Sequence, residues 1–150
     1  MNPDSVWAKT RFAHARIARL ATASVDGVPH LVPITFAVVG DTIVSAVDHK
    51  PKSTTRLRRL ANIAANPRVS LLVDEYSEAW TQLWWARADG LASVVTDGPG
   101  FAAAVDALAQ RYPHYQAAPP AGPVIVVDVS RWSAWSAALL SSNSNDHSTP

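Results

Sequence analysis

Three apolar runs separated by two glycine turns constrain the fold of this 150-residue chain more than any other feature. The turns fall at Asp26-Gly27 and Gly40-Asp41. An Asp-Gly pair between apolar runs is a strong hairpin signal, because tight turns need positive φ values that glycine adopts without strain. The runs are therefore predicted to be consecutive antiparallel strands, at residues 16–24, 30–39 and 42–48. Pro33 lacks an N–H, so the second strand is expected to have a free edge or a bulge.

The rest of the chain alternates further strands with helices. Helices are predicted at residues 5–15, 53–65 and 97–112, and strands at 68–74, 80–95 and 123–135. The strand at 80–95 is expected to bend at Gly90, and residues 114–122 are expected to form a loop. The apolar face of the second helix is assigned to Leu57, Leu60, Ala61 and Ala64. This order predicts a mainly β (α+β) fold, a six-stranded antiparallel barrel with peripheral helices.

Composition limits the classes of protein that this chain can belong to. With 48% hydrophobic and 17% charged residues it is typical of a globular domain, and a net charge of +1 provides no general attraction to nucleic acid. The absence of cysteine excludes disulfides and thiolate metal sites, and the five histidines show no metal-ligand spacing. No secretory signal or membrane-length apolar run is evident. We expect a single cytoplasmic domain at residues 1–140 and a disordered tail at 141–150.

Residues 48–59 contain the sharpest functional signal. Five cations are concentrated here, namely Lys50, Lys52, Arg56, Arg58 and Arg59, and hydroxyls at 53–55 begin the predicted helix. A helix N-terminus has unpaired N–H groups and a positive dipole end, which suit a phosphate. Basic residues raise the energy of a helix there unless an anion binds. The segment is therefore interpreted as a phosphate site, with a solvated basic helix face as the alternative.

Two adjacent tryptophans mark the long strand at 80–95. Successive strand residues point to opposite faces, so one of Trp84 and Trp85 is expected to enter the barrel and the other to face outward. An outward tryptophan needs a subunit or a flat ligand to cover it. Together with Trp80 this aromatic excess predicts a homodimer.

Three segments carry a resemblance to a known family: ARLATASVDGVPHLVPITF, VDHKPKSTTRLRRLANIAANPRVSLLVD and LWWARADG. They resemble the pyridoxamine-phosphate-oxidase-like, FMN-binding split β-barrel family over roughly residues 5–135. More narrowly, they are similar to its actinobacterial branch, which uses the deazaflavin coenzyme F-420. The resemblance implies an oxidoreductase (a reductase) that transfers hydride between F-420 and an unsaturated small molecule. It also implies a homodimer with a cofactor at the subunit interface.

The resemblance also implies a set of cofactor-binding residues. The phosphate would lie against the basic segment, and the flavin-type ring would lie along the second and third strands. The partner's long strand would contribute to the same site. The residues implied are Pro33, Thr35, Lys50, Lys52, Ser53, Thr54, Arg56, Arg59, Trp85 and Arg87. No catalytic residue and no metal ligand is assigned, because the cofactor carries the chemistry.

The same residues are compatible with other functions. One is an FMN-binding oxidase or flavin reductase of the same fold, and another is a non-catalytic cofactor-binding or carrier protein. Relatives also bind haem-type ligands. Pyridoxamine phosphate is disfavoured as a substrate, since only Arg131 provides a cation near the C-terminus. A nucleic-acid binder is disfavoured by the near-zero net charge and the lack of a recognition motif.

The basic segment gives the first testable prediction. Lys52→Ala should weaken cofactor binding by roughly 1.5–3 kcal/mol, about ten- to a hundredfold, through loss of one charge-assisted phosphate contact. Titration of the folded variant with F-420 measures this loss. Unchanged affinity would mean that the basic segment is only a solvated helix face.

Overall fold

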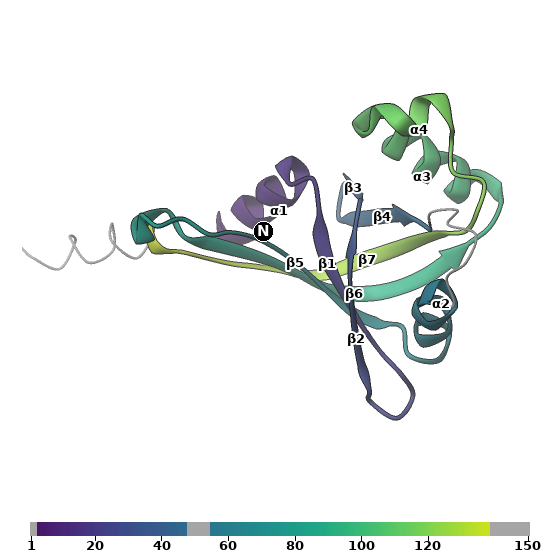
Figure 1. Ribbon diagram of the computed structural model, residues 1–150, viewed down its shortest axis with the longest axis horizontal. Coiled ribbons are helices and arrows are strands. Elements are labelled where there is room, and N and C mark those ends of the chain that lie inside the picture. Colours follow the sequence, from purple (N-terminus) through teal and green to yellow (C-terminus); the bar gives the residue numbers. More distant parts are fainter. Residues whose placement is uncertain (1–2, 48–54, 139–150) are drawn as a thin grey trace, which may run out of the picture.

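A computed structural model of the chain describes residues 3–47 and 55–138. Most of its elements belong to one curved sheet with helices packed around it (Figure 1). The strands are β1 (Ala18–Ala23), β2 (Pro29–Ile34), β3 (Ala37–Val39), β4 (Thr42–Ala46), β5 (Arg68–Glu75), β6 (Trp84–Val95) and β7 (Val124–Ser136). The helices are α1 (Pro3–His14), α2 (Thr55–Ala65), the 3-10 turn η1 (Trp80–Gln82), α3 (Gly98–Arg111) and α4 (Pro113–Ala117).

The seven strands lie in the order β2-β1-β5-β6-β7-β4-β3, and every neighbouring pair is antiparallel. The two edge strands, β2 and β3, are consecutive in the chain and are separated only by Thr35 and Phe36. The chain thus pairs with β1 as β2, bends at Thr35 and Phe36, and then pairs with β4 as β3. The bend links both edges of the sheet and curls it into a split barrel. The antiparallel split barrel is confirmed, but the count of six strands is wrong because residues 30–39 form two strands.

Side chains replace the ladder at this bend. The Ser45 hydroxyl donates to the Thr35 carbonyl at 2.7 Å, and the Phe36 N–H donates to the Tyr112 hydroxyl at 3.1 Å. The Tyr112 hydroxyl also lies 3.0 Å from the Phe36 carbonyl and 2.9 Å from the Arg16 carbonyl, both of which can accept its proton. Buried backbone groups need such partners, so the bend depends on Tyr112 at the end of α3.

The inner face of the sheet and two helices, α1 and α2, enclose the main core. Its largest fully buried side chains include Phe12, Phe36, Leu20, Ile43 and Leu71. Helix α1 covers one opening, where the Phe12 ring meets the rings of Phe36 and Trp132 edge-on, with centroids 5.9 and 5.4 Å apart. A second cluster joins α3 and α4 to the outer face of β3, β4 and β7. Apart from Val95 at the end of β6, no described residue on the outer face of β1, β5 and β6 belongs to either core cluster.

Asp41 fastens α1 to the barrel. Its carboxylate accepts from Lys9 Nζ of α1 at 3.2 Å and from the Trp132 indole at 3.1 Å. The pKa of Asp41 is lowered below its ordinary value, mainly by the hydrogen bond from Trp132 and to a smaller extent by the hydrogen bond from Lys9. The β3–β4 turn that carries Asp41 contains Gly40 at φ +61°, as the Gly40-Asp41 prediction requires.

Strands β5, β6 and β7 continue beyond the barrel as a long ribbon (Figure 1). The predicted bend at Gly90 is confirmed by a register shift between Asp89 and Gly90, which leaves Ser130 of β7 as a bulge. A Cβ at Gly90 would lie 2.2 Å from the Asp128 carbonyl oxygen, so the close approach of the strands requires glycine. The strand predicted from residue 80 begins at Trp84, because residues 80–82 form η1.

The structure corrects two other predictions. The predicted loop at 114–122 contains α4, which begins at Pro113, a residue suited to a first helical turn. The predicted apolar face of α2 is right at Leu60, which packs against the core, but wrong at Ala61 and Ala64, which are exposed, whereas Asn62 and Ile63 are buried. The start of the second helix at 53–54 and the tail at 141–150 lie outside the described residues. No described helix is both long and apolar enough to span a membrane.

Tyr112→Phe tests the role of the bend. The substitution keeps the ring but removes the hydroxyl that serves the backbone of Phe36 and Arg16. Because buried groups lose a partner, the free energy of unfolding should fall by about 1–3 kcal/mol. Urea denaturation measures this change, with the exposed Tyr76→Phe as the control. Equal stability of Tyr112→Phe and the wild type would contradict this account of the bend.

Candidate cofactor site

The outer face of the sheet carries several predicted site residues in register. Pro33 lies opposite Arg19, Arg19 opposite Leu72, Leu72 opposite Arg87, and Arg87 opposite Ser133. One row of residues therefore crosses five strands, from β2 to β7. Trp85 lies in the next row, between Asp74 and Trp135. Pro33, Trp85 and Arg87 thus share one face, because side chains of alternate strand residues point the same way.

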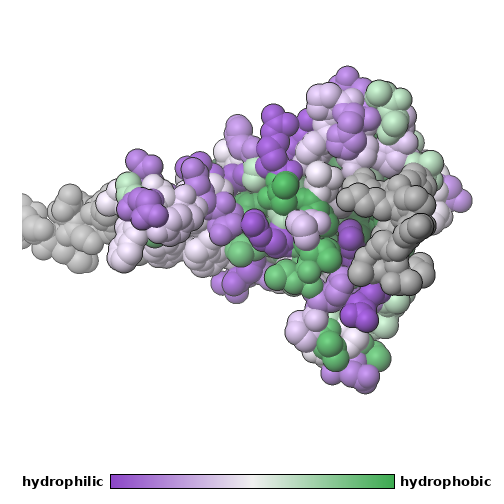
Figure 2. Space-filling view, viewed as in Figure 1, coloured by the Kyte–Doolittle hydropathy of each residue, from purple (hydrophilic) through white to green (hydrophobic). Residues whose placement is uncertain are grey.

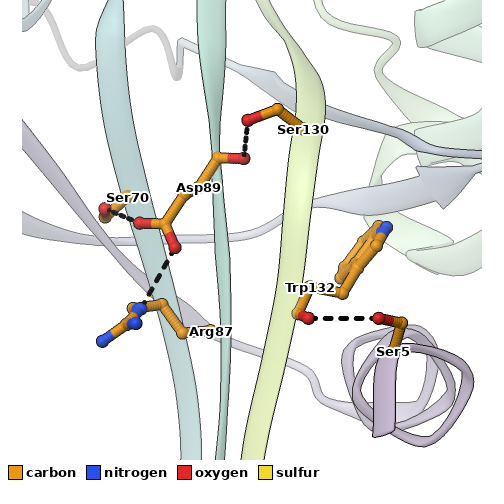
Figure 3. A network of polar contacts seen from close by, with 6 residues as sticks. All are labelled: Ser5, Ser70, Arg87, Asp89, Ser130 and Trp132. Carbon is orange, nitrogen blue, oxygen red and sulfur yellow. Dashed lines mark hydrogen bonds and ion pairs between the residues drawn. The ribbon is translucent and has the colours of Figure 1, made fainter. Parts of the chain in front are cut away.

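A belt of charged and polar side chains crosses this outer face. Asp89 accepts hydrogen bonds from the Ser70 hydroxyl and from Arg87 Nε, the latter at 3.2 Å (Figure 3). In the same belt Arg19 pairs with Asp74 at 3.4 Å. Figure 3 shows Ser70, Arg87 and Asp89 on the side of the sheet away from Trp132 and α1. We call these five residues, Arg19, Ser70, Asp74, Arg87 and Asp89, the outer belt.

An aromatic groove lies next to the outer belt. Its volume is about 460 Å³, and it is more apolar than the belt. The Arg87 guanidinium lies 5.5 Å from the centre of the Trp85 ring, within the range of a cation–π contact. The residues around the groove include Leu72, Tyr76, Leu83, Trp84, Trp85 and Trp135. A flat ring could lie against these side chains.

The two adjacent tryptophans point to opposite faces, as their alternation on a strand predicts. Trp84 lies on the core side, but at the margin of the core rather than inside the barrel. Its ring meets Trp7 of α1 edge-on at 5.8 Å, its indole donates to Glu75 at 2.9 Å, and the Arg11 guanidinium lies 4.8 Å from its ring centre. Trp84 therefore has partners within the chain, whereas Trp85 faces outward and is half-buried.

A second group of polar residues lies at the α2 end, on the inner side. The buried Asn62 of α2 donates to the Thr22 hydroxyl at 3.1 Å. His30 lies opposite Thr22 in the ladder, and its Nδ1 is buried without a hydrogen-bond partner among the described residues. The predicted site residue Arg59 is half-buried on the same helix. A buried ring nitrogen without a partner fits a polar or anionic ligand that binds beside α2.

His30 and Asn62 were not identified from the sequence. A lone histidine on a strand forms no recognisable motif, and Asn62 is not among the residues predicted for the apolar face of its helix. One sequence signal could have indicated that His30 points inward. It alternates with Leu31 and so shares its face of β2 with the apolar residues Val32 and Ile34.

Thr35 lies at the bend. Its hydroxyl is hydrogen-bonded to the Tyr115 hydroxyl at 3.2 Å, and its carbonyl accepts from Ser45. Lys50, Lys52, Ser53 and Thr54 lie outside the described residues, as does the side chain of Arg56. Arg59 lies on the core side of the sheet, whereas Trp85 and Arg87 lie on the outer face. One chain therefore does not bring these two groups together.

Residues 8–136 match the family model described as pyridoxamine 5'-phosphate oxidase. The chain belongs to the pyridoxamine 5'-phosphate oxidase family. None of the curated protein sequences matches it.

Solved structures similar to this family member share its fold at low sequence identity. A conserved hypothetical protein of Mycobacterium tuberculosis is 21% identical with a TM-score of 0.72, over 94% of this chain and 88% of its own. An FAD-binding protein of Mesorhizobium loti is 21% identical with a TM-score of 0.68, over 87% and 92%. The haem storage protein HutZ of Vibrio cholerae is 15% identical with a TM-score of 0.65, over 90% and 93%.

The outer belt should contribute little to stability. The side chains of Arg87 and Asp89 are 42% and 34% exposed, so solvent screens their ion pair. Arg87→Met should therefore lower the free energy of unfolding by no more than about 1 kcal/mol. Urea denaturation of the variant and the wild type measures the difference. A loss of several kcal/mol would mean that the belt holds the sheet together.

Proposed function

We propose that this chain is an F-420-dependent oxidoreductase that acts as a homodimer, with each cofactor site built from both subunits. One subunit would provide the α2 end, with the basic segment, Arg59 and His30. The other would provide the outer face, with Trp85 and Arg87. The observation that carries this proposal is the separation of these groups on opposite faces of one sheet.

The uncovered outer face supports the dimer. Trp85 and Leu72 are half-buried there without a helix over them, and Leu31 and Leu91 remain 66% and 54% exposed. Figure 2, which looks onto the side of the molecule where β3 lies in Figure 1, shows further apolar surface gathered in the middle of the view. An apolar surface of this kind, rimmed by charges, is typical of a protein–protein interface.

The described residues suit a flavin-type cofactor. Trp85 offers an aromatic face, Arg87 offers donors, and His30 Nδ1, which has no partner among the described residues, can bond a polar group of the ligand. When bound, the deazaflavin would supply the hydride for an unsaturated substrate. The protein's residues would hold the ring against an apolar surface, orient it and limit the access of water. No acid–base triad is needed for these roles.

We propose F-420 as the cofactor in place of FMN because F-420 has a charged tail. The cations from Lys50 to Arg59 are spread along a loop and a helix, which suits the several carboxylates beyond the F-420 phosphodiester. A single phosphate monoester would need a compact cluster of donors instead. Because the tail would meet partly exposed cations, its contribution to affinity should weaken with salt.

Titration of the purified protein with F-420 and with FMN, at low and at high salt, tests the cofactor. F-420 should bind more tightly, with a margin that shrinks as the ionic strength rises. Equal affinities, or tighter FMN binding at low salt, would exclude the deazaflavin and support an FMN oxidase or flavin reductase. Binding of F-420 without turnover of any enone or imine substrate would support a carrier.

Subunit complementation tests the shared site. Lys52→Ala and Arg87→Met should each weaken F-420 binding, while Arg87→Met stays folded. If the two residues come from different subunits, co-refolding both variants restores about a quarter of the sites, since half of the dimers are mixed and one of their two sites is intact. No restoration would place both residues in one subunit. A monomer mass by light scattering at micromolar concentration would also exclude the shared site.

A further inference from the structure

A second groove lies on the opposite side of the molecule from the outer belt. It has a volume of about 470 Å³ and lies where β3 has no strand on its second edge. In Figure 1, β3 lies between α1 and α3. Ala13 of α1, residues 37–39 of β3, and Ala107, Gln110 and Arg111 of α3 line the groove. None of them belongs to the candidate cofactor site.

Arg111 is an unusual member of this apolar lining. Burial lowers the pKa of its guanidinium, and the nearby positive charge of Arg16 acts in the same direction. Within the described residues, Arg111 forms no ion pair with a carboxylate. Its guanidinium lies 4.8 Å from the centre of the Phe36 ring and donates to the Phe36 carbonyl at 3.1 Å. The groove therefore contains a half-buried cation without a counter-ion from the described chain.

Contacts within the described chain use only part of the Arg111 guanidinium, which lies 4.8 Å from the centre of the Phe36 ring and 5.6 Å from that of the Tyr112 ring. The Phe36 carbonyl that it bonds also lies within hydrogen-bond distance of the Tyr112 hydroxyl, at 3.0 Å. The guanidinium has five N–H donors in a planar fork that matches a carboxylate, and one of them is used at Phe36. The remaining donors are suited to an anion.

The lining limits the class of anion. One guanidinium and the Gln110 amide are its polar side chains, and the other lining residues are alanine or valine. A phosphate dianion would need more donors, whereas a carboxylate needs one planar fork. We propose that this groove binds a monocarboxylate with an apolar body. Arg111 holds the carboxylate, and the body lies against Val38, Val39 and Ala107.

Octanoate is a suitable probe, with octanol and octylamine as controls of equal chain length. Titration into isotopically labelled protein should shift the backbone amides of Ala37, Val38 and Ala107, and the dissociation constant follows from these shifts. Octanoate should bind at least about tenfold more tightly than octanol, because only the carboxylate pairs with Arg111. Octylamine should bind more weakly than octanol.

Two variants test the role of charge. Arg111→Met keeps an apolar stem of similar length and should weaken octanoate binding at least about tenfold, with the exposed Arg131→Met as the matched control. Val39→Glu places a competing carboxylate at the groove, and Val39→Gln is its neutral control. Val39 is 52% exposed, so both Val39 variants should fold even if Arg111→Met does not. Val39→Glu should weaken octanoate binding, whereas Val39→Gln should not.

Three results would overturn the proposal. The first is that the amides at the groove do not shift up to about 10 mM octanoate. The second is that octanoate and octanol bind equally tightly. The third is that Val39→Glu and Val39→Gln change the affinity for octanoate equally. None of these results depends on F-420 binding, because the two sites share no residue. A failure here would leave the proposed function intact.

Discussion

The hydroxyl of Tyr112 lies at the point on which the barrel depends. At Thr35 and Phe36 the chain leaves one ladder and has not yet joined the next, so its backbone groups need other partners. The Tyr112 hydroxyl accepts from the Phe36 N–H and can donate its one proton to the carbonyl of Phe36 or of Arg16, which comes just before β1. A buried backbone group left without a partner costs about 1–3 kcal/mol. Helix α3 thus packs on the outer face of the sheet and, through Tyr112 at its end, also provides the hydrogen bonds of the bend.

Closing the barrel determines where a ligand can bind. Large side chains such as Phe12, Phe36 and Ile43 fill the interior among the described residues, as in other small barrels. We therefore expect a flavin-type ring to bind at an end of the barrel or on its outer face. The outer belt carries two cations and two anions in alternating ion pairs, Arg19 with Asp74 and Arg87 with Asp89. Such a surface can be complementary to its own copy across a two-fold axis, which supports the proposed dimer.

The sequence predicted those parts of the fold that short segments determine. The turns at Gly27 and Gly40 adopt positive φ, as their hairpin patterns require. The split of residues 30–39 could not be predicted in this way, because it depends on Tyr112, 76 residues after Phe36. The burial of Asn62 was missed for the same reason. Its partner Thr22 lies 40 residues away, and without that partner asparagine fits an exposed helix face better.

The basic part of the candidate site could be predicted from the sequence, because its cations are neighbours in the chain. The division of the site residues between two faces of the sheet could not, because it depends on contacts between distant segments. Helix α1 has Asp4 in its first turn and Arg11 in its last, as the helix dipole favours. Helix α2 has no acidic residue in its first turn and no basic residue in its last, and its arginines all lie in its first half. Each cation near a helix N-terminus costs about 0.3–1 kcal/mol at low salt. An anion at that end would reverse this cost, so the arrangement favours ligand binding over the stability of the free chain.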